Sequence, residues 1–238
     1  MRNGRWMAIV AVIAIAAGTV ATQVSWAGGG GGGVDPANFT APKANPYFPL
    51  VVGRVLVYRG SEDGLSLHER LTVTHDTRMI AGVSTLVISD VLRSEGRLVE
   101  QTTDWYQGDN DGNIWYFGEN TATYDAQGNV DSTEGTWRAG VDGAVAGIIM
   151  PANPGPTDAY RQEFYAGHAE DQAWIVQGGV HAQVPIGSID QGIRSFEWTR
   201  LEPAVMSVKI YGPGLGIVLE KDIAGGNEML ELVKVIRP

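Results

Sequence analysis

The chain has 238 residues, of which 44% are hydrophobic, and its formal net charge at pH 7 is −10. The apolar share is that of a globular protein, and the absence of cysteine excludes a disulfide scaffold, thiolate metal sites and a cysteine nucleophile. Because so acidic a chain repels phosphate groups and anionic lipid surfaces, nucleic acid and membrane surfaces are not expected as partners.

Residues 1–27 have the pattern of a secretory signal peptide. Two arginines lie within the first five positions, and the uncharged apolar run Met7–Ala17 follows them. Ser25 and Ala27 then place small residues at the −3 and −1 positions of a cleavage site. The alternative is a retained anchor over residues 6–24. We expect cleavage after Ala27, an exported product that is periplasmic or extracellular, and no membrane insertion after cleavage.

Residues 28–45 predict a flexible linker between this leader and the rest of the chain. Six consecutive glycines occupy positions 28–33, and Pro36 and Pro42 follow. Such a segment has high backbone entropy and little apolar surface to offset it. We therefore expect a single β-rich domain over residues 46–238.

From residue 47 onward the sequence predicts short strands separated by turns. The segments are rich in β-branched and aromatic residues, and Asp-Gly, Glu-Gly and Gly-Asn pairs between them are typical of antiparallel hairpins. The strands expected are Val52–Arg59, Leu67–His75, Val83–Leu92, Arg97–Gln107, Ile114–Glu119, Thr121–Asp125, Val130–Thr133, Tyr160–Tyr165, Ala173–Val176, Val180–Val184, Ile193–Arg200, Val205–Tyr211, Gly216–Glu220 and Met229–Ile236.

The segment Gly140–Met150 is the least regular part of the chain. It is interrupted by glycines and followed by three prolines, so we interpret it as a loop that crosses the molecule and holds at most one helical turn. No segment has helical periodicity over three turns, and no repeat of 20–50 residues indicates a solenoid or propeller. The predicted fold is all-β, an antiparallel meander that forms a curved sheet, sandwich or barrel with few or no helices.

Three segments carry a resemblance to known sequences. They are Asn45–Leu50 followed by Gly53 and Tyr58, then Asp104–Gln107 with Gly112–Glu119, and finally Val184–Ile189 with Lys209–Gly216. Together they resemble a group of secreted bacterial proteins and lipoproteins of uncharacterised function with a YFPL…G…Y opening, a DWYxQ…GNxWYFGE centre and a VPxG…KxYxPGxG ending. Ile189 departs from the usual Phe, and Val55 or Val57 from the usual Trp. The resemblance implies export and a β-meander, and it carries no catalytic residues over.

The acidic turn at residues 109–113 is the best candidate for a metal site. Asp109, Asp111 and Asn113 match the first, third and fifth positions of an EF-hand loop, and calcium prefers such oxygen ligands. Ile114 and Asn120 then stand where that loop needs a glycine and a bidentate glutamate. The alternative is a polar hairpin turn whose Asp and Asn residues tolerate left-handed backbone geometry.

Aromatic residues gather on the two strands that this turn joins. The spacing predicts that Trp105 faces Phe117 and that Tyr106 faces Tyr116 across the hairpin. One interpretation is core packing. The other is a platform for an apolar or carbohydrate ligand, formed by Trp105, Tyr106, Trp115 and Tyr116.

No catalytic motif stands out in the sequence. The four histidines lack metalloprotease spacing, and no Gly-x-Ser-x-Gly elbow is present. The leading hypothesis is therefore an exported, non-enzymatic binding or interaction module whose partner is a small ligand or an envelope protein. The alternatives are a hydrolase with a site assembled from scattered Asp, Glu, Ser and His, and a calcium-stabilised structural protein.

Overall fold

The computed structural model describes residues 34–238, so the predicted signal peptide and glycine run lie outside the described residues. Within the described part, no helix has the length and apolar character needed to cross a membrane. A single short 3-10 helix, η1 (Pro36–Phe39), precedes the strands. The strands are β1 (Val55–Glu62), β2 (Leu65–Ile80), β3 (Val83–Ser94), β4 (Arg97–Gly108), β5 (Ile114–Tyr124), β6 (Val130–Ser132), β7 (Trp137–Arg138), β8 (Val145–Met150), β9 (Ala159–Arg161), β10 (Glu163–Phe164), β11 (Asp171–Val184), β12 (Gly187–Thr199), β13 (Met206–Gly212), β14 (Gly216–Ala224) and β15 (Met229–Ile236).

These strands form one antiparallel sheet that almost closes on itself. The order of hydrogen-bonded neighbours is β10-β8-β5-β4-β3-β2-β1-β15-β14-β13-β12-β11-β9, with β6 and β7 also pairing with β5. The two end strands of this order, β9 and β10, are separated by a single residue along the chain, so the bend at Gln162 brings the two edges of the sheet together. The all-β prediction is confirmed, in its barrel form.

Tight turns fix the register of the hairpins. Asp63 and Gly64 have φ angles of 50° and 78°, and Glu95 and Gly96 have 49° and 78°. Two consecutive positive φ angles are the mark of a type I′ turn, whose twist matches that of the flanking strands. The predicted hairpins β1–β2 and β3–β4 therefore form as their turn sequences indicate.

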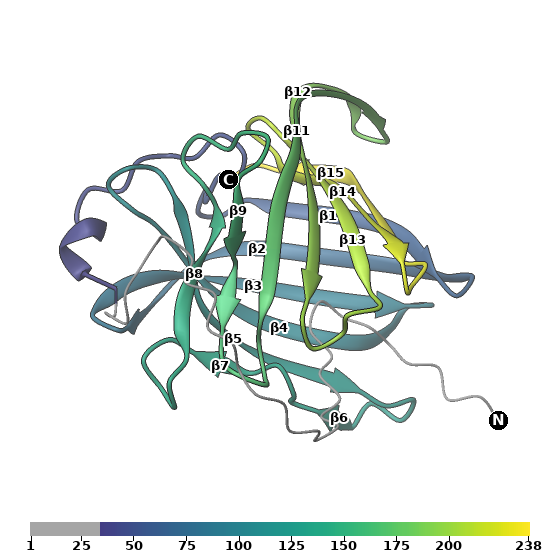
Figure 1. Ribbon diagram of the computed structural model, residues 1–238. Helices are drawn as coiled ribbons and strands as arrows, with labels where there is room; N and C mark the ends of the chain where they lie inside the picture. The colour runs from purple at the N-terminus through teal and green to yellow at the C-terminus, as the bar shows by residue number, and fades with distance from the viewer. Residues whose placement is uncertain (1–33) are drawn as a thin grey trace.

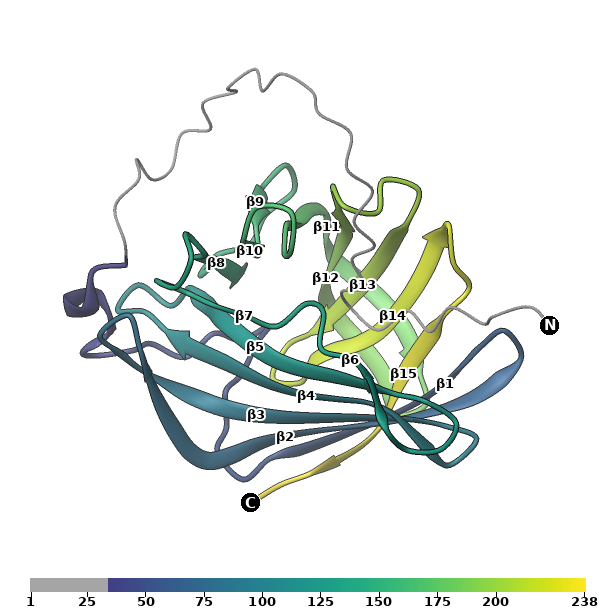
Figure 2. The ribbon, with the colours of Figure 1, turned by 90° about the horizontal axis from the view of Figure 1, so that it is seen from below.

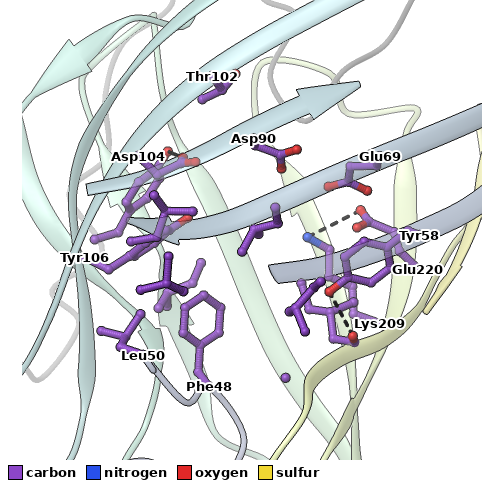
Figure 3. Close-up of a pocket in the computed structure, with 18 of the residues that line it drawn as sticks. Phe48, Leu50, Tyr58, Glu69, Asp90, Thr102, Asp104, Tyr106, Lys209 and Glu220 are labelled. Carbon is purple, nitrogen blue, oxygen red and sulfur yellow. Dashed lines mark hydrogen bonds and ion pairs between the residues drawn. The ribbon is translucent and has the colours of Figure 1, made fainter. Parts of the chain in front are cut away.

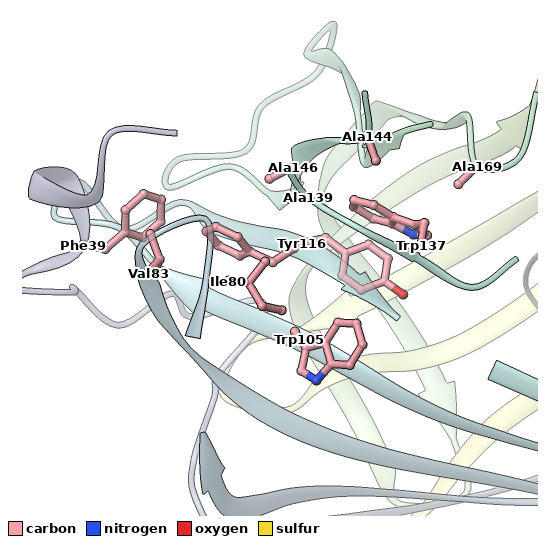
Figure 4. Close-up of a cluster of buried hydrophobic side chains, with 11 residues drawn as sticks. Phe39, Ile80, Val83, Trp105, Tyr116, Trp137, Ala139, Ala144, Ala146 and Ala169 are labelled. Atoms are coloured by element: carbon pink, nitrogen blue, oxygen red, sulfur yellow. The ribbon is translucent and has the colours of Figure 1, made fainter. Parts of the chain in front are cut away.

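The nearly closed sheet curves so that its two halves face each other. Strands β11–β14 cross over strands β1–β4 (Figure 1), and the turned view shows the same curvature (Figure 2). Three clusters of buried apolar side chains fill parts of the molecule. The cluster around Phe117 and Trp137 holds β5 against β7 and β8 (Figure 4).

Residues 34–45 differ from the expected flexible linker, because they pack against the barrel. Phe39 is 8% exposed, and its ring makes edge contacts with Trp115 and Phe117 at centroid distances of 6.0 and 5.5 Å. Asn45 is 2% exposed, and its amide nitrogen donates to two backbone carbonyls at 2.9 Å. The linker prediction rested on the backbone entropy of this glycine- and proline-rich segment. Burial of Phe39 offsets the entropy that is lost when residues 34–45 become ordered.

The segment expected to be a crossing loop also differs, because residues 145–150 form strand β8 between β5 and β10. Its glycine is needed for close approach: a Cβ atom at Gly147 would lie 2.5 Å from the carbonyl carbon and oxygen of Gln162. The glycines that suggested a loop are thus what lets β8 sit beside the bend that closes the barrel.

Candidate functional site

A cavity of about 140 Å³ lies between the two halves of the barrel. Strands β1–β5 supply one wall, and β12–β14 supply the other. Phe48 and Leu50, from the segment before β1, lie together with Tyr106 on one side of it (Figure 3). Asp104, beside Tyr106, then Asp90 and Glu69 follow one another along the top of the same view. The cavity therefore has an apolar part and an acidic part.

The acidity comes from inward-facing positions on neighbouring strands. Alternate residues of a strand point to the same face, which brings charged side chains of β2, β3, β4 and β5 into the interior. Two basic residues, Lys209 and Arg54, also line the cavity. The carboxyl groups that line it are those of Glu69, Asp90, Glu100, Asp104, Glu119, Glu163, Asp171, Glu197 and Glu220.

Strands β4 and β5 present a ladder of cross-strand pairs to the cavity. Asp104 lies directly opposite Glu119, and Tyr106 lies opposite Tyr116. The two tyrosine rings stack with their centroids 4.6 Å apart, and the Tyr116 hydroxyl donates to Asp104 Oδ1 at 2.8 Å. The predicted Tyr106–Tyr116 pairing is confirmed. The predicted pairing of Trp105 with Phe117 is wrong, because the register shifts between Asp104 and Tyr106 and leaves Trp105 without a direct partner on β5.

A buried ion cluster occupies the opposite wall. Lys209 Nζ lies 3.2 Å from Glu197 Oε2 and 3.3 Å from Glu220 Oε1, and each of the three side chains is at most 10% exposed. Ser195 and Tyr211 both donate to Glu197 Oε1 at 2.7 Å. Burial alone would raise the pKa of Glu197, but the Lys209 charge and these donors hold it below its ordinary value. Lys209 is therefore charged and fully engaged.

The carboxyl groups of the β4–β5 wall accept hydrogen bonds from Tyr116 and Thr102, but they have no cationic partner among the described residues. Burial, and next the charge of Asp90, raise the pKa of Asp104 to about 7 and that of Glu100 to about 8. Burial, and next the charge of Glu163, raise the pKa of Glu119 well above its ordinary value. In the cavity as the structure shows it, these groups favour their protonated forms near neutral pH.

Several of these groups also lack hydrogen-bond partners. Glu163 is 1% exposed, and neither of its carboxyl oxygens has one. The indole of Trp137 and the backbone N–H of Asp171 lie near Glu163 but outside hydrogen-bonding geometry, and the indole N–H has no partner either. Glu119 Oε1 and Asp90 Oδ1 are likewise buried and unpartnered. Since buried polar atoms are normally paired, these atoms are exceptions among the polar groups of the barrel.

The structure divides the four aromatic residues predicted to bind a ligand. Tyr106 and Tyr116 line the cavity. Trp105 points to the opposite face of β4 and is 3% exposed. The guanidinium carbon of Arg78 lies over the Trp105 ring, 4.3 Å from the ring centroid. Trp115 is outside the cavity lining as well, and its Nε1 donates to Asp109 Oδ2 at 2.9 Å.

The acidic turn is stabilised by its own hydrogen bonds. Asp109 Oδ1 accepts from the backbone N–H groups of Asp111, Gly112 and Asn113 at 2.8–2.9 Å, and Oδ2 accepts from the side chains of Asn113 and Trp115. Five donors fill the approximately four lone-pair sites of a carboxylate. Over residues 34–238, no three His, Asp or Glu side chains are arranged to hold a metal. The geometry favours the polar-turn alternative, and calcium binding at this turn stays a prediction.

Sequence reasoning missed the carboxyl groups of the cavity. Every second residue of β4 between positions 100 and 106 is polar or aromatic, namely Glu100, Thr102, Asp104 and Tyr106. This alternation is typical of the solvent-facing side of an amphipathic strand. One signal in the sequence could have found them. The polar row on β4 ends in Tyr106, and β5 repeats the pattern, with Glu119 opposite Asp104 and Tyr116 opposite Tyr106.

Comparison with known proteins finds similarity only in solved structures. No protein family model and no curated protein matches the chain. A Bacteroides fragilis protein, provisionally described as exported and as having a YmcC-like fold, aligns with 12% identity and a TM-score of 0.48. A Parabacteroides distasonis protein, provisionally described as a lipoprotein, aligns with 13% identity and a TM-score of 0.45. Each alignment covers 82% of this chain and 100% of the other. Similarity at this level says nothing of what this chain binds.

Proposed function

We propose that this chain is an exported, non-enzymatic binding protein that holds a small organic molecule in the cavity between the two halves of its barrel. The observation that carries the proposal is the cavity itself, which is lined by both apolar and unpartnered polar groups. Small-molecule sites commonly combine an apolar lining with a few polar groups that orient the ligand.

The apolar part of the cavity fits the body of such a ligand. The Phe48 ring lies 5.2 Å from that of Tyr106, which stacks in turn on Tyr116. Leu50 and Ile149 complete this side of the lining. Aromatic faces of this kind take apolar or carbohydrate surfaces, in agreement with the ligand class expected from the aromatic cluster.

The export part of the proposal is supported by the sequence. The charged start, the apolar run and the small residues before position 28 form a secretory leader. The resemblance to secreted bacterial proteins and lipoproteins extends over residues 45–235 and agrees with it. The destination of the protein is then the periplasm or the cell exterior.

Native mass spectrometry tests the binding function. The full-length gene is expressed, and the protein is recovered from the exported fraction without denaturation. We expect the polypeptide mass plus a non-covalent mass of roughly 100 Da, because the cavity of about 140 Å³ is close in volume to one of about 150 Å³ that holds benzene. A bare polypeptide mass would count against the proposal.

A pair of variants shows whether a bound mass lies in the cavity. Leu71 lines the cavity, whereas its neighbour Arg70 is exposed. Leu71→Trp fills part of the space and should abolish the added mass, while Arg70→Ala should retain it. Retention by a folded Leu71→Trp protein would place the bound molecule elsewhere and overturn the assignment of the cavity.

A further inference from the structure

The charges that line the cavity do not balance. Nine carboxyl groups face two basic side chains. Lys209 is already taken by Glu197 and Glu220. Arg54 donates to the Gly214 carbonyl at 2.9 Å and forms no ion pair with any described carboxylate. No cationic side chain in residues 34–238 therefore pairs with the carboxyl groups of β4, β5 and β10.

A second observation, independent of the number of acidic groups, points to a missing donor. Both oxygens of Glu163 and Oε1 of Glu119 are buried and accept no hydrogen bond, although Glu163 is 1% exposed and Glu119 4%. An unpaired buried carboxyl group loses the hydrogen bonds that water would give it, and this cost is relieved when a donor arrives. Both residues belong to the cavity lining, so a ligand that enters the cavity lies beside them.

Three strands bring these acceptors to one region. Asp104 and Glu119 are direct cross-strand neighbours, which places their side chains about 5 Å apart at the Cβ atoms. Glu163, on β10, lines the same cavity. Burial and the charge of Glu163 raise the pKa of Glu119, while burial and the charges of Asp171 and Asp104 raise the pKa of Glu163. A bound primary ammonium group favours the ionised forms of these carboxyl groups, which then offer only acceptors to its three donor hydrogens.

The neighbouring rings and apolar side chains define the rest of the ligand. The Tyr116 hydroxyl contacts Asp104 directly, so the stacked faces of Tyr116 and Tyr106 begin beside the acidic group. A cation next to aromatic rings gains further attraction from their π electrons. Beyond them, Phe48 and Leu50 offer surface to a hydrocarbon chain (Figure 3).

We propose that the cavity selects a primary amine with an apolar body, whose ammonium group is bound by Glu163, Glu119 and Asp104 while its hydrocarbon part lies against Phe48 and Leu50. This inference rests on the proposed binding function and specifies its ligand class.

Two probes that share a hydrocarbon chain and differ in the head group test the inference. Hexylamine and 1-hexanol have the same hydrocarbon chain, and at neutral pH only the amine is charged. Binding of each is followed by protein-observed NMR titration at millimolar concentrations. We expect the amine to bind at least about tenfold more tightly, as loss of one charged hydrogen-bonded contact predicts.

The outcomes separate the two proposals. Equal or tighter binding of hexanol would overturn the amine inference and leave the binding cavity in place. Failure of both probes to bind, together with a bare mass in native mass spectrometry, would overturn both. Glu163→Gln should lower hexylamine affinity about tenfold or more and leave hexanol unchanged. Glu134→Gln, in an exposed turn, should alter neither.

A second variant guards against loss of folding. If Glu163→Gln does not fold, Glu119→Gln gives the same test, because its side chain faces the same region from β5. A folded variant of either kind that binds hexylamine as the unmodified chain does would overturn the assignment of these carboxyl groups.

Discussion

Replacing Lys209 by methionine removes the ammonium group that lies between Glu197 and Glu220. At 3.2 and 3.3 Å, each ion pair gives about 5 kcal/mol of Coulomb attraction at an effective dielectric constant of about 20. Desolvation of the three groups offsets much of this gain. Methionine fills a similar volume, so the main effect is to leave two buried carboxyl groups without a counter-charge.

We expect Lys209→Met to lower the free energy of unfolding by about 3–5 kcal/mol at pH 7.5, the usual result of removing one partner from a buried ion pair. The measurement is urea denaturation followed by tryptophan fluorescence. Lys221→Met is the matched control, since Lys221 is exposed on the same sheet and should lose less than about 0.5 kcal/mol.

The pH dependence identifies the cause. Below pH 5, Glu197 and Glu220 of the variant can take up protons and become neutral. The difference in the free energy of unfolding between the variant and the unmodified chain should therefore shrink. A loss of less than about 1 kcal/mol at pH 7.5, or a deficit that is the same at pH 4.5, would refute the account of Lys209 as the counter-charge of this wall.

Further predictions address the other wall, the turn and the barrel closure. Asp104, whose pKa is raised to about 7, holds a proton in the folded protein that it releases in the unfolded chain, so its contribution to stability is complete below about pH 4 and is lost as the pH rises to about 7. The melting temperature should therefore fall between pH 5 and 8, and a rise over that range would contradict the assignment. Glu163→Gln should raise the free energy of unfolding at pH 7.5 by about 1 kcal/mol or more, because the amide carries no charge to suppress; a decrease of that size would argue that the carboxyl group is paired. Asp109→Ala should cost about 2–4 kcal/mol in urea denaturation, since several backbone donors lose their acceptor, and added calcium should not restore it. Gly147→Ala should cost about 1–3 kcal/mol or more because its Cβ meets backbone, whereas Gly155→Ala, with its nearest neighbour at 3.8 Å, should be close to neutral.

The sequence predicts the fold class because its local signals agree with one another. Asp63-Gly64 and Glu95-Gly96 need positive φ angles, and both turns join the strands that the apolar patterns predict. The same local signals fail at residues 34–45 and 145–150. There the outcome depends on distant partners: Phe39 is held by β5, and Gly147 by the bend at residue 162.

The candidate site was harder to predict, for a related reason. Tyr106 and Tyr116 could be paired from their spacing around one turn, whereas Trp105 and Trp115 point away from the cavity. Period-two alternation says which residues share a face of the sheet but not whether that face meets water or a second wall. The inward row of β4 is acidic, so its burial follows from closure of the barrel and not from its own pattern.

The acidic wall is the feature that the proposed amine ligand explains best. A barrel interior selected for stability alone would hold apolar side chains, as the clusters around Phe117 and Leu232 do. Instead, both carboxyl oxygens of Glu163 and Oε1 of Glu119 are buried without a hydrogen-bond partner, and burial raises the pKa of both groups well above its ordinary value, at a cost in stability. Residues that lower the stability of the folded protein are often found at functional sites. A cationic ligand would supply the hydrogen-bond donors and the positive charge that this wall lacks. The free energy gained when the buried carboxyl groups are paired would then contribute to the affinity for the ligand.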